Sequence, residues 1–191
     1  MIAIITISCA ADRGAKQDAV RETWAKNLPC RHIFLLGRGN TNLKDDEWVV
    51  NADDSYAGLT EKLRAFYRDA TQIDHTFISC IDTYIVPVRL FALPFPEHNF
   101  VGRPCENEPH ASGGNGYWLD RLARSAIAIQ DPFPGYADQA DFRALAVAGI
   151  KLHPDNRIGS SATKHLSRGT GNYDPAWMYE THRKFMEQSL D

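Results

Sequence analysis

Continuous apolar runs alternate with segments of helical periodicity through the first half of the chain. Residues 2–8 (IAIITIS) and 32–37 (HIFLLG) are such runs, and each is typical of a strand that is buried on both faces. In segments 16–28 and 59–72, apolar residues recur at intervals of three and four, which predicts amphipathic helices. The alternation predicts an α/β fold with a mostly parallel central sheet flanked by helices.

The same pattern predicts further elements. Short strands are expected at 47–50 (EWVV) and 75–81 (HTFISCI). In the second half, which several prolines interrupt, helices are expected to begin near Tyr117, near Asp138 and in the terminal segment 176–188.

Composition limits the classes of function. The chain has 191 residues, 43% hydrophobic and 24% charged, so we expect one domain over 1–191. The net charge is −3 and no run of Lys or Arg exceeds two residues, which argues against nucleic-acid binding. No apolar run approaches the roughly 20 residues of a transmembrane segment. The four cysteines, which show no C-x-x-C spacing, fit reduced thiols in a cytoplasmic compartment, with two disulfides as the alternative.

A single carboxylate, Asp82, follows the stretch 77–81 (FISCI), which is apolar except for Ser79 and Cys80. In parallel α/β sheets, ligands bind beyond the carboxyl ends of the strands, and an acid placed there can hold a metal ion or a sugar hydroxyl. The alternative is a structural role, in which Asp82 accepts hydrogen bonds from the backbone of the segment that follows.

Five stretches carry motifs: DAVRETW (18–24), DDSYAGLTEK (53–62), ISCIDTYIV (78–86), SGGNGYWLD (112–120) and ADQADFRALAVAGI (137–150). In order and spacing they resemble AIRxTW, DSYxNLTxK, KxDDDTYV, SGGxGYxLS and EDVxxGxxLxxxGI of the β-1,3-glycosyltransferase family, which includes the β-1,3-galactosyltransferases and the Fringe-type enzymes.

The resemblance implies a single GT-A-like (Rossmann-like) domain, with a nucleotide-binding half (1–86) and an acceptor and catalytic half (87–191). It implies an inverting enzyme that moves a sugar from a UDP-sugar to a hydroxyl of a glycan or other acceptor, with a divalent metal such as Mn²⁺. In this interpretation Asp82 is a metal ligand and Asp138 is the general base. Asp141, one helical turn further on, is the competing candidate for the base.

The resemblance is incomplete at the acidic motif. Cys80, Ile81 and Asp82 stand where the family has three acids, so only the last acid of the motif remains. Cys80 therefore stands at a position that contacts the nucleotide in the family. A thiol ligand suits Zn²⁺ better than Mn²⁺, and the alternative is that Cys80 is a small buried hydrophobe.

The family also has a histidine metal ligand downstream of the base. His165, in a polar loop, is the preferred candidate, and His153 and His182 are the alternatives. A neutral imidazole is an acceptable ligand for Mn²⁺ or Zn²⁺.

Three further residues are candidates for contact with the donor. Gly113 and Gly114 would let the backbone pass close to the donor or acceptor, or else form a turn into the next element. Arg21 would bind the diphosphate or else form a structural salt bridge.

Two other classes of protein are alternatives to a glycosyltransferase. The main alternative is a GT-A-like nucleotide-sugar-binding protein or pseudoenzyme. A dehydrogenase is disfavoured because SCAADRG, not G-x-G-x-x-G, follows the first strand. Since the initial Met leads directly into that strand, with no counterpart of a Golgi anchor, we expect a soluble, cytoplasmic enzyme of bacterial or viral origin.

Overall fold

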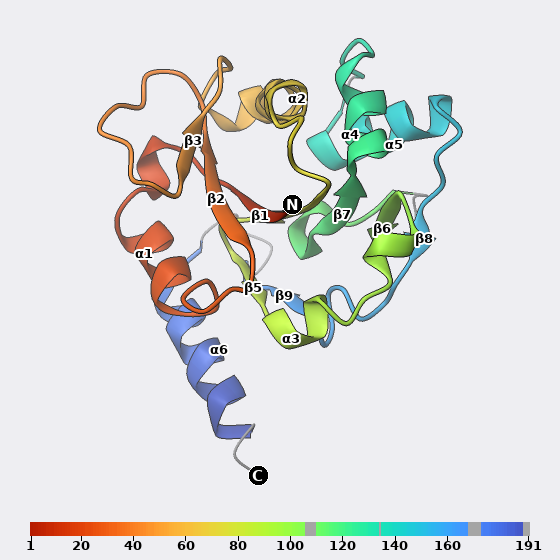
Figure 1. The fold of residues 1–191 in the computed structure, drawn as a ribbon. Helices are drawn as coiled ribbons and strands as arrows, with labels where there is room; N and C mark the ends of the chain where they lie inside the picture. The colour runs from red at the N-terminus through yellow and green to blue at the C-terminus, as the bar shows by residue number, and fades with distance from the viewer. Residues whose placement is uncertain (106–109, 134, 168–172, 189–191) are drawn as a thin grey trace.

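Seven strands form one sheet at the centre of the protein, in the order β3-β2-β1-β4-β7-β6-β8 (Figure 1). The computed structural model describes residues 1–105, 110–133, 135–167 and 173–188. The strands of this sheet are β1 (Ile2–Ile7), β2 (Arg31–Leu36), β3 (Glu47–Val49), β4 (His75–Cys80), β6 (Phe100–Gly102), β7 (Tyr117–Asp120) and β8 (His153–Pro154).

The sheet is mostly parallel. β1 pairs in parallel with β2 and β4, β2 pairs in parallel with β3, and β6 pairs in parallel with β8. Among the described strands of this sheet, only β7 runs antiparallel to its neighbours, β4 and β6. The predicted fold class, a mostly parallel sheet flanked by helices, is confirmed.

Helices cover both faces of the sheet. On one face α2 (Leu59–Asp69), α4 (Arg121–Ala128) and α5 (Ala137–Val147) pack together, at the top of Figure 1. The other face is covered by α1 (Ala15–Glu22), α3 (Pro87–Leu90) and α6 (Pro175–Gln188). Short 3₁₀ helices are η1 (Ala10–Asp12), η2 (Tyr56–Gly58), η3 (Phe95–Glu97) and η4 (Gly113–Asn115). No helix among the described residues has the length and apolar character needed to span a membrane.

Alternate side chains of the inner strands fill the two cores. Ile5 and Leu35 belong to the cluster beneath α2, α4 and α5, whereas Ile4 and Phe34 belong to the cluster beneath α1 and α6. Because successive strand residues point to opposite faces, a strand covered on both sides must be apolar throughout. This explains why β1 and β2 appear in the sequence as continuous apolar runs.

The helix that the sequence predicts near Tyr117 is wrong at its start. Residues Tyr117–Asp120 form β7, and α4 begins at Arg121. The Asp120 carboxylate accepts a hydrogen bond from the Ala123 N–H (2.7 Å) and so caps the helix. The strand is favoured because it buries Trp118, whose ring stacks on Phe95 at 3.8 Å between centroids.

A second, two-stranded sheet lies beyond the end of β4. It pairs β5 (Thr83–Ile85) with β9 (Thr163–His165) in antiparallel orientation. This pairing ties the carboxyl edge of the main sheet to a segment from the end of the chain.

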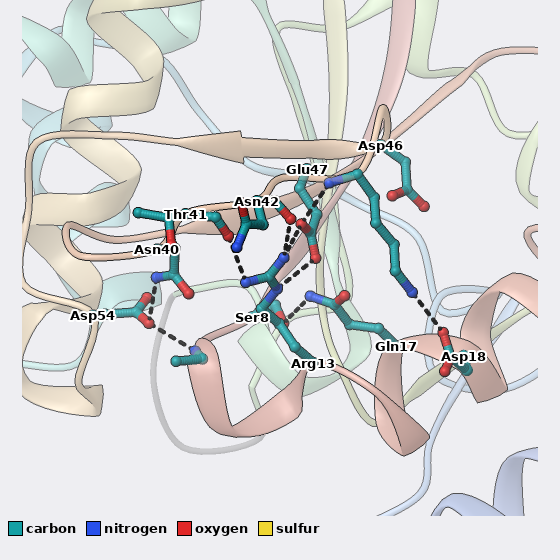
Figure 2. A network of polar contacts seen from close by, with 12 residues as sticks. Ser8, Arg13, Gln17, Asp18, Asn40, Thr41, Asn42, Asp46, Glu47 and Asp54 are labelled. Carbon is teal, nitrogen blue, oxygen red and sulfur yellow. Dashed lines mark hydrogen bonds and ion pairs between the residues drawn. The ribbon is translucent and has the colours of Figure 1, made fainter.

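Polar contacts fix the loops at the carboxyl ends of β1 and β2 (Figure 2). Arg13 donates to both carboxylate oxygens of Glu47, at 3.0 and 2.9 Å. Asp54 accepts hydrogen bonds from the Ala10 N–H (2.7 Å) and from the buried Lys62 Nζ (2.8 Å). These contacts tie the loop after β1 to β3 and to the loop after β3, and Lys62 ties that second loop to α2.

Candidate active site

Three cavities have Tyr56 and Leu59 in their walls, and two of them, A and B, open at the carboxyl ends of β1 and β4. Cavity A, of about 490 Å³, is lined by Cys80, Asp82 and His165. Cavity B, of about 260 Å³, is lined by Cys80 and Asp138 among others. Cavity C, of about 310 Å³, lies between the start of α2 and the start of α5. The volume of cavity A alone lies within the range of roughly 300–1,000 Å³ that is typical of ligand pockets.

Asp82 and His165 form the central pair of cavity A. Asp82 Oδ2 lies 3.0 Å from His165 Nε2, and Ser167 Oγ donates to the same oxygen. The pairing of Thr83 with His165 in the small sheet brings the imidazole to the carboxylate. The structure thus brings together the two residues that the sequence proposes as metal ligands.

The two groups hold each other in their charged forms. Burial by itself would raise the pKa of Asp82, but hydrogen bonds from His165 and Ser167 outweigh this effect and lower that pKa. The hydrogen bond to Asp82 raises the pKa of His165. Each group thus favours the charged form of the other, and a bound cation would take the place of the imidazolium proton.

The other two candidate histidines lie elsewhere. The His153 ring stacks on His98 with centroids 3.6 Å apart, at the β8 edge of the sheet. His182 lies on α6, and its Nδ1 is 3.0 Å from the hydroxyl of Tyr84 on β5. Neither lines cavity A.

The glycine loop lies directly between Asp138 and His165. The Gly113 N–H donates to Asp138 Oδ2 (2.9 Å). A Cβ on Gly113 would lie 2.8 Å from that oxygen, and a Cβ on Gly114 would lie 2.9 Å from His165 Nδ1. The absence of side chains at both positions lets the carboxylate and the imidazole approach one loop.

Asp138 and Asp141 differ in access to the cavities. Asp138, in the first turn of α5, lines cavity B. Asp141 is 1% exposed, and its Oδ2 accepts hydrogen bonds from Tyr67 and Tyr117, each at 2.8 Å. Burial raises the pKa of Asp141 to about 7. Only Asp138, of these two acids, faces the open site.

Cys80 lies between the two cavities as a neutral thiol. Burial, followed by the negative charges of Asp82 and Asp138, raises the pKa of Cys80 to about 12. Its Sγ lies 3.8 Å from the Gly113 carbonyl oxygen. The thiol is half-buried and uncharged, which fits a small hydrophobic residue, the alternative to a soft ligand, except that its burial is incomplete.

Arg21 does not line cavity A. Its guanidinium donates to both carboxylate oxygens of Asp46, at 2.7 and 2.9 Å, and to Asp18 at 2.9 Å. These contacts match the structural alternative. Arg21 is therefore not part of the candidate site.

Lys16 also lines cavity A, although no sequence motif pointed to it. Lys16 lies in the first turns of α1, and its Nζ donates to Asp12 Oδ1 at 2.8 Å. Its position after the first strand was a usable signal, because the first βα turn of such sheets commonly binds phosphate.

The pair of Asp82 and His165 fits a divalent cation as part of a ligand set. The described part of the chain holds no group of three or more His, Cys, Asp or Glu side chains that could bind a metal ion. A carboxylate oxygen and an imidazole nitrogen are both acceptable ligands for Mn²⁺. The remaining positions would have to come from a ligand's phosphates and from water.

Comparison with known proteins relates this chain to glycosyltransferases. No protein-family model matches it. It is 24% identical over 157 residues to human N-acetyllactosaminide β-1,3-N-acetylglucosaminyltransferase 3, an alignment that covers 79% of this chain and 41% of that enzyme. The match thus spans about two fifths of the human enzyme.

Solved structures show the same fold. The catalytic domain of Drosophila β1,4-galactosyltransferase 7 with xylobiose matches with a TM-score of 0.52 at 10% identity, over 95% of this chain and 81% of that one. A mutant of that enzyme with manganese, UDP-Gal and xylobiose gives 0.50 at 9% identity, over 93% and 79%. The apo glycosyltransferase GlyE of Streptococcus pneumoniae gives 0.51 at 10% identity, over 99% and 64%. The chain has the GT-A fold.

Proposed function

We propose that this protein is an inverting glycosyltransferase of the β-1,3 type, which moves a sugar from a UDP-sugar to a hydroxyl of a glycan or other acceptor. One observation carries the proposal. Consecutive glycines of a single loop, Gly113 and Gly114, lie against Asp138 and His165 respectively. A candidate base and a candidate metal ligand therefore face adjoining cavities.

Cavity A would bind the donor. Asp82 and His165 would hold a divalent cation, with Mn²⁺ preferred for its oxygen and nitrogen ligands. When bound, the cation would neutralise the charge that develops on the departing diphosphate. Lys16, at the start of α1, would add a second positive charge for the phosphates.

Asp138 would act in cavity B as the general base. The acceptor oxygen attacks the anomeric carbon as the bond from that carbon to the phosphate oxygen breaks, and UDP leaves with the electron pair. Asp138 takes the hydroxyl proton, and attack opposite the leaving group inverts the anomeric configuration. Such a base typically contributes about 10²–10⁴ in rate. The burial of Asp141 beneath two tyrosine hydroxyls supports the choice of Asp138.

The two halves of the chain would divide these tasks. Residues 1–86 would supply most of the donor contacts, and residues 87–191 would supply the base and the acceptor contacts. His165 reaches back to Asp82 across this division. The sequence similarity to a β-1,3-N-acetylglucosaminyltransferase and the manganese and UDP-Gal named for a structural neighbour support this assignment.

A nucleotide-sugar-binding protein without transferase activity is the second candidate. It is favoured by the neutral thiol of Cys80 where the family has an acid, and by the lack of a third protein metal ligand among the described residues.

Incubation with a set of UDP-sugars, Mn²⁺ and a glycan acceptor panel separates the two candidates. The enzyme releases UDP and forms a product whose anomeric configuration, measured by NMR, is opposite to that of the donor. Donor binding without UDP release on any acceptor would support the binding protein.

A further inference from the structure

Two exposed tyrosines stand at the entrance to the candidate base. Tyr56 is 77% exposed and Tyr136 is 63% exposed. Large aromatic rings left in water commonly mark binding sites. Both rings line cavity B, together with Asp138, and both line cavity C.

The two tyrosines come from different elements and line one cavity with Asp138. Tyr56 is the first residue of η2, and Tyr136 is the residue before α5. Both side chains line cavity B together with Asp138.

Cavity C is lined mainly by apolar atoms, with a few polar groups and no charged side chain in its described wall. Its lining consists of Tyr56, Ala57, Leu59, Thr60, Gly135, Tyr136, Ala137 and Gln139. Gly135, with φ of 119°, brings its backbone against Gln139, where a Cβ would lie 2.8 Å from Oε1. An uncharged wall of aromatic rings, a hydroxyl and an amide suits a neutral ligand that carries both C–H and hydroxyl groups.

We propose that Tyr56 and Tyr136 form an acceptor subsite, which stacks a neutral pyranose ring and directs one of its hydroxyls to Asp138. The C–H face of a pyranose is apolar and packs on an aromatic ring, while its hydroxyls hydrogen-bond at the ring edge, where Thr60 and Gln139 lie. This inference rests on the proposed function, because it assigns the acceptor of the same site.

The nucleotide base is the competing occupant of these rings. Tyr56 also lines cavity A, but Tyr136 does not. A subsite that uses both rings is therefore centred on cavities B and C, away from the Asp82 and His165 pair.

Saturation-transfer NMR with methyl β-glycopyranosides tests the proposal without knowledge of the natural acceptor. The probes are the glucoside, galactoside, xyloside and N-acetylglucosaminide, with a sialoside as the charged comparison, each with and without UDP and Mn²⁺. At least one neutral probe should receive saturation at the protons of one ring face, and the sialoside should receive none.

Four variants locate the contact. Tyr136→Ala and Tyr56→Ala should each lower the affinity for the neutral probe about tenfold. Tyr136→Ala should lower the affinity for the probe far more than the affinity for UDP. Tyr56→Phe should retain the probe because it keeps the ring. Tyr179→Ala removes another exposed tyrosine, one that is bonded to Glu22, and should change nothing.

Three results would overturn the proposal: no neutral probe binds the wild type, the two alanine variants bind the probe as the wild type does, or Tyr136→Ala loses UDP and sugar equally. A failure of UDP to bind, with ring-dependent sugar binding intact, would overturn the proposed transferase and leave the sugar subsite standing.

Discussion

Asp82 Oδ2 lies 3.0 Å from His165 Nε2 because the backbone pairs Thr83 with His165 in the small sheet. The Leu166 N–H also donates to the Asp82 carbonyl (2.9 Å). The position of the imidazole is thus set by the strand pairing as well as by its own ion pair. A ligand pair placed in this way is organised before a cation binds.

His165→Ala should abolish the Mn²⁺-dependent part of UDP affinity, because Asp82 alone leaves the cation with one protein ligand. Isothermal titration of UDP with and without Mn²⁺ measures this difference. His153→Ala and His182→Ala are matched controls and should keep the Mn²⁺-dependent part of UDP affinity. Equal loss in all three variants would show that the effect is on the fold.

Gly113→Ala and Gly114→Ala should separate catalysis from metal binding. The new Cβ of the first would meet Asp138 Oδ2 at 2.8 Å, and that of the second would meet His165 Nδ1 at 2.9 Å. Both contacts are to side-chain ends, which can shift while the fold is kept. Gly113→Ala should reduce the transfer rate more than tenfold and retain Mn²⁺-dependent UDP binding, whereas Gly114→Ala should weaken that binding. The same defect in both variants would contradict the assignment.

Cys80→Ser should retain Mn²⁺-dependent UDP binding, because the thiol is neutral and the thiolate is the form that binds metal ions. Cys80→Asp adds a carboxylate near Asp82 and Asp138, so it should lower the melting temperature of the apo protein and restore it when Mn²⁺ and UDP are added. Differential scanning fluorimetry measures both shifts. Loss of the bound metal in the serine variant, with zinc detected in the wild type by mass spectrometry, would instead make Cys80 a ligand.

Asp141→Asn should change the pH dependence of stability. The pKa of Asp141 is raised from 3.8 to about 7 in the folded protein, so the folded state holds the proton more tightly than the unfolded chain. Its contribution is present below about pH 4 and is lost as the pH rises through about 7, by up to about 4 kcal/mol. Urea unfolding at pH 5 and pH 8 should therefore show the variant gaining stability relative to the wild type at the higher pH. Asp45→Asn, at an exposed loop position, is the control, and parallel behaviour of the two variants would refute the role of burial.

The strands that position the site could be predicted from sequence because they are covered on both faces. β1 is an almost continuous apolar run, β4 has an apolar centre at Phe77 and Ile78, and Asp82 comes just after β4. β7 could not be separated from α4 by periodicity, since Tyr117–Asp120 leads into Arg121 with no loop between them. The usable signal was Asp120, a residue type that favours a helix N-cap.

The partners within the site depend on contacts between distant segments. Three histidines have the same chemistry, and only the pairing of β5 with β9 selects His165. The guanidinium of Arg21 could bind phosphate, but it forms a salt bridge with Asp46, from the segment before β3. Such choices are set by which loops meet, and local sequence patterns do not contain that information.

Metal-dependent nucleotide binding at Asp82 is the central feature of the proposed site. The decisive measurement is calorimetry of UDP binding to the wild type and to Asp82→Asn, each with and without Mn²⁺. We predict that Mn²⁺ strengthens UDP binding to the wild type at least tenfold and has no effect on the variant, which should remain folded because asparagine keeps an oxygen acceptor for Ser167. Wild-type affinity that is unchanged by Mn²⁺, or a variant that responds to Mn²⁺ as the wild type does, would contradict the proposed site.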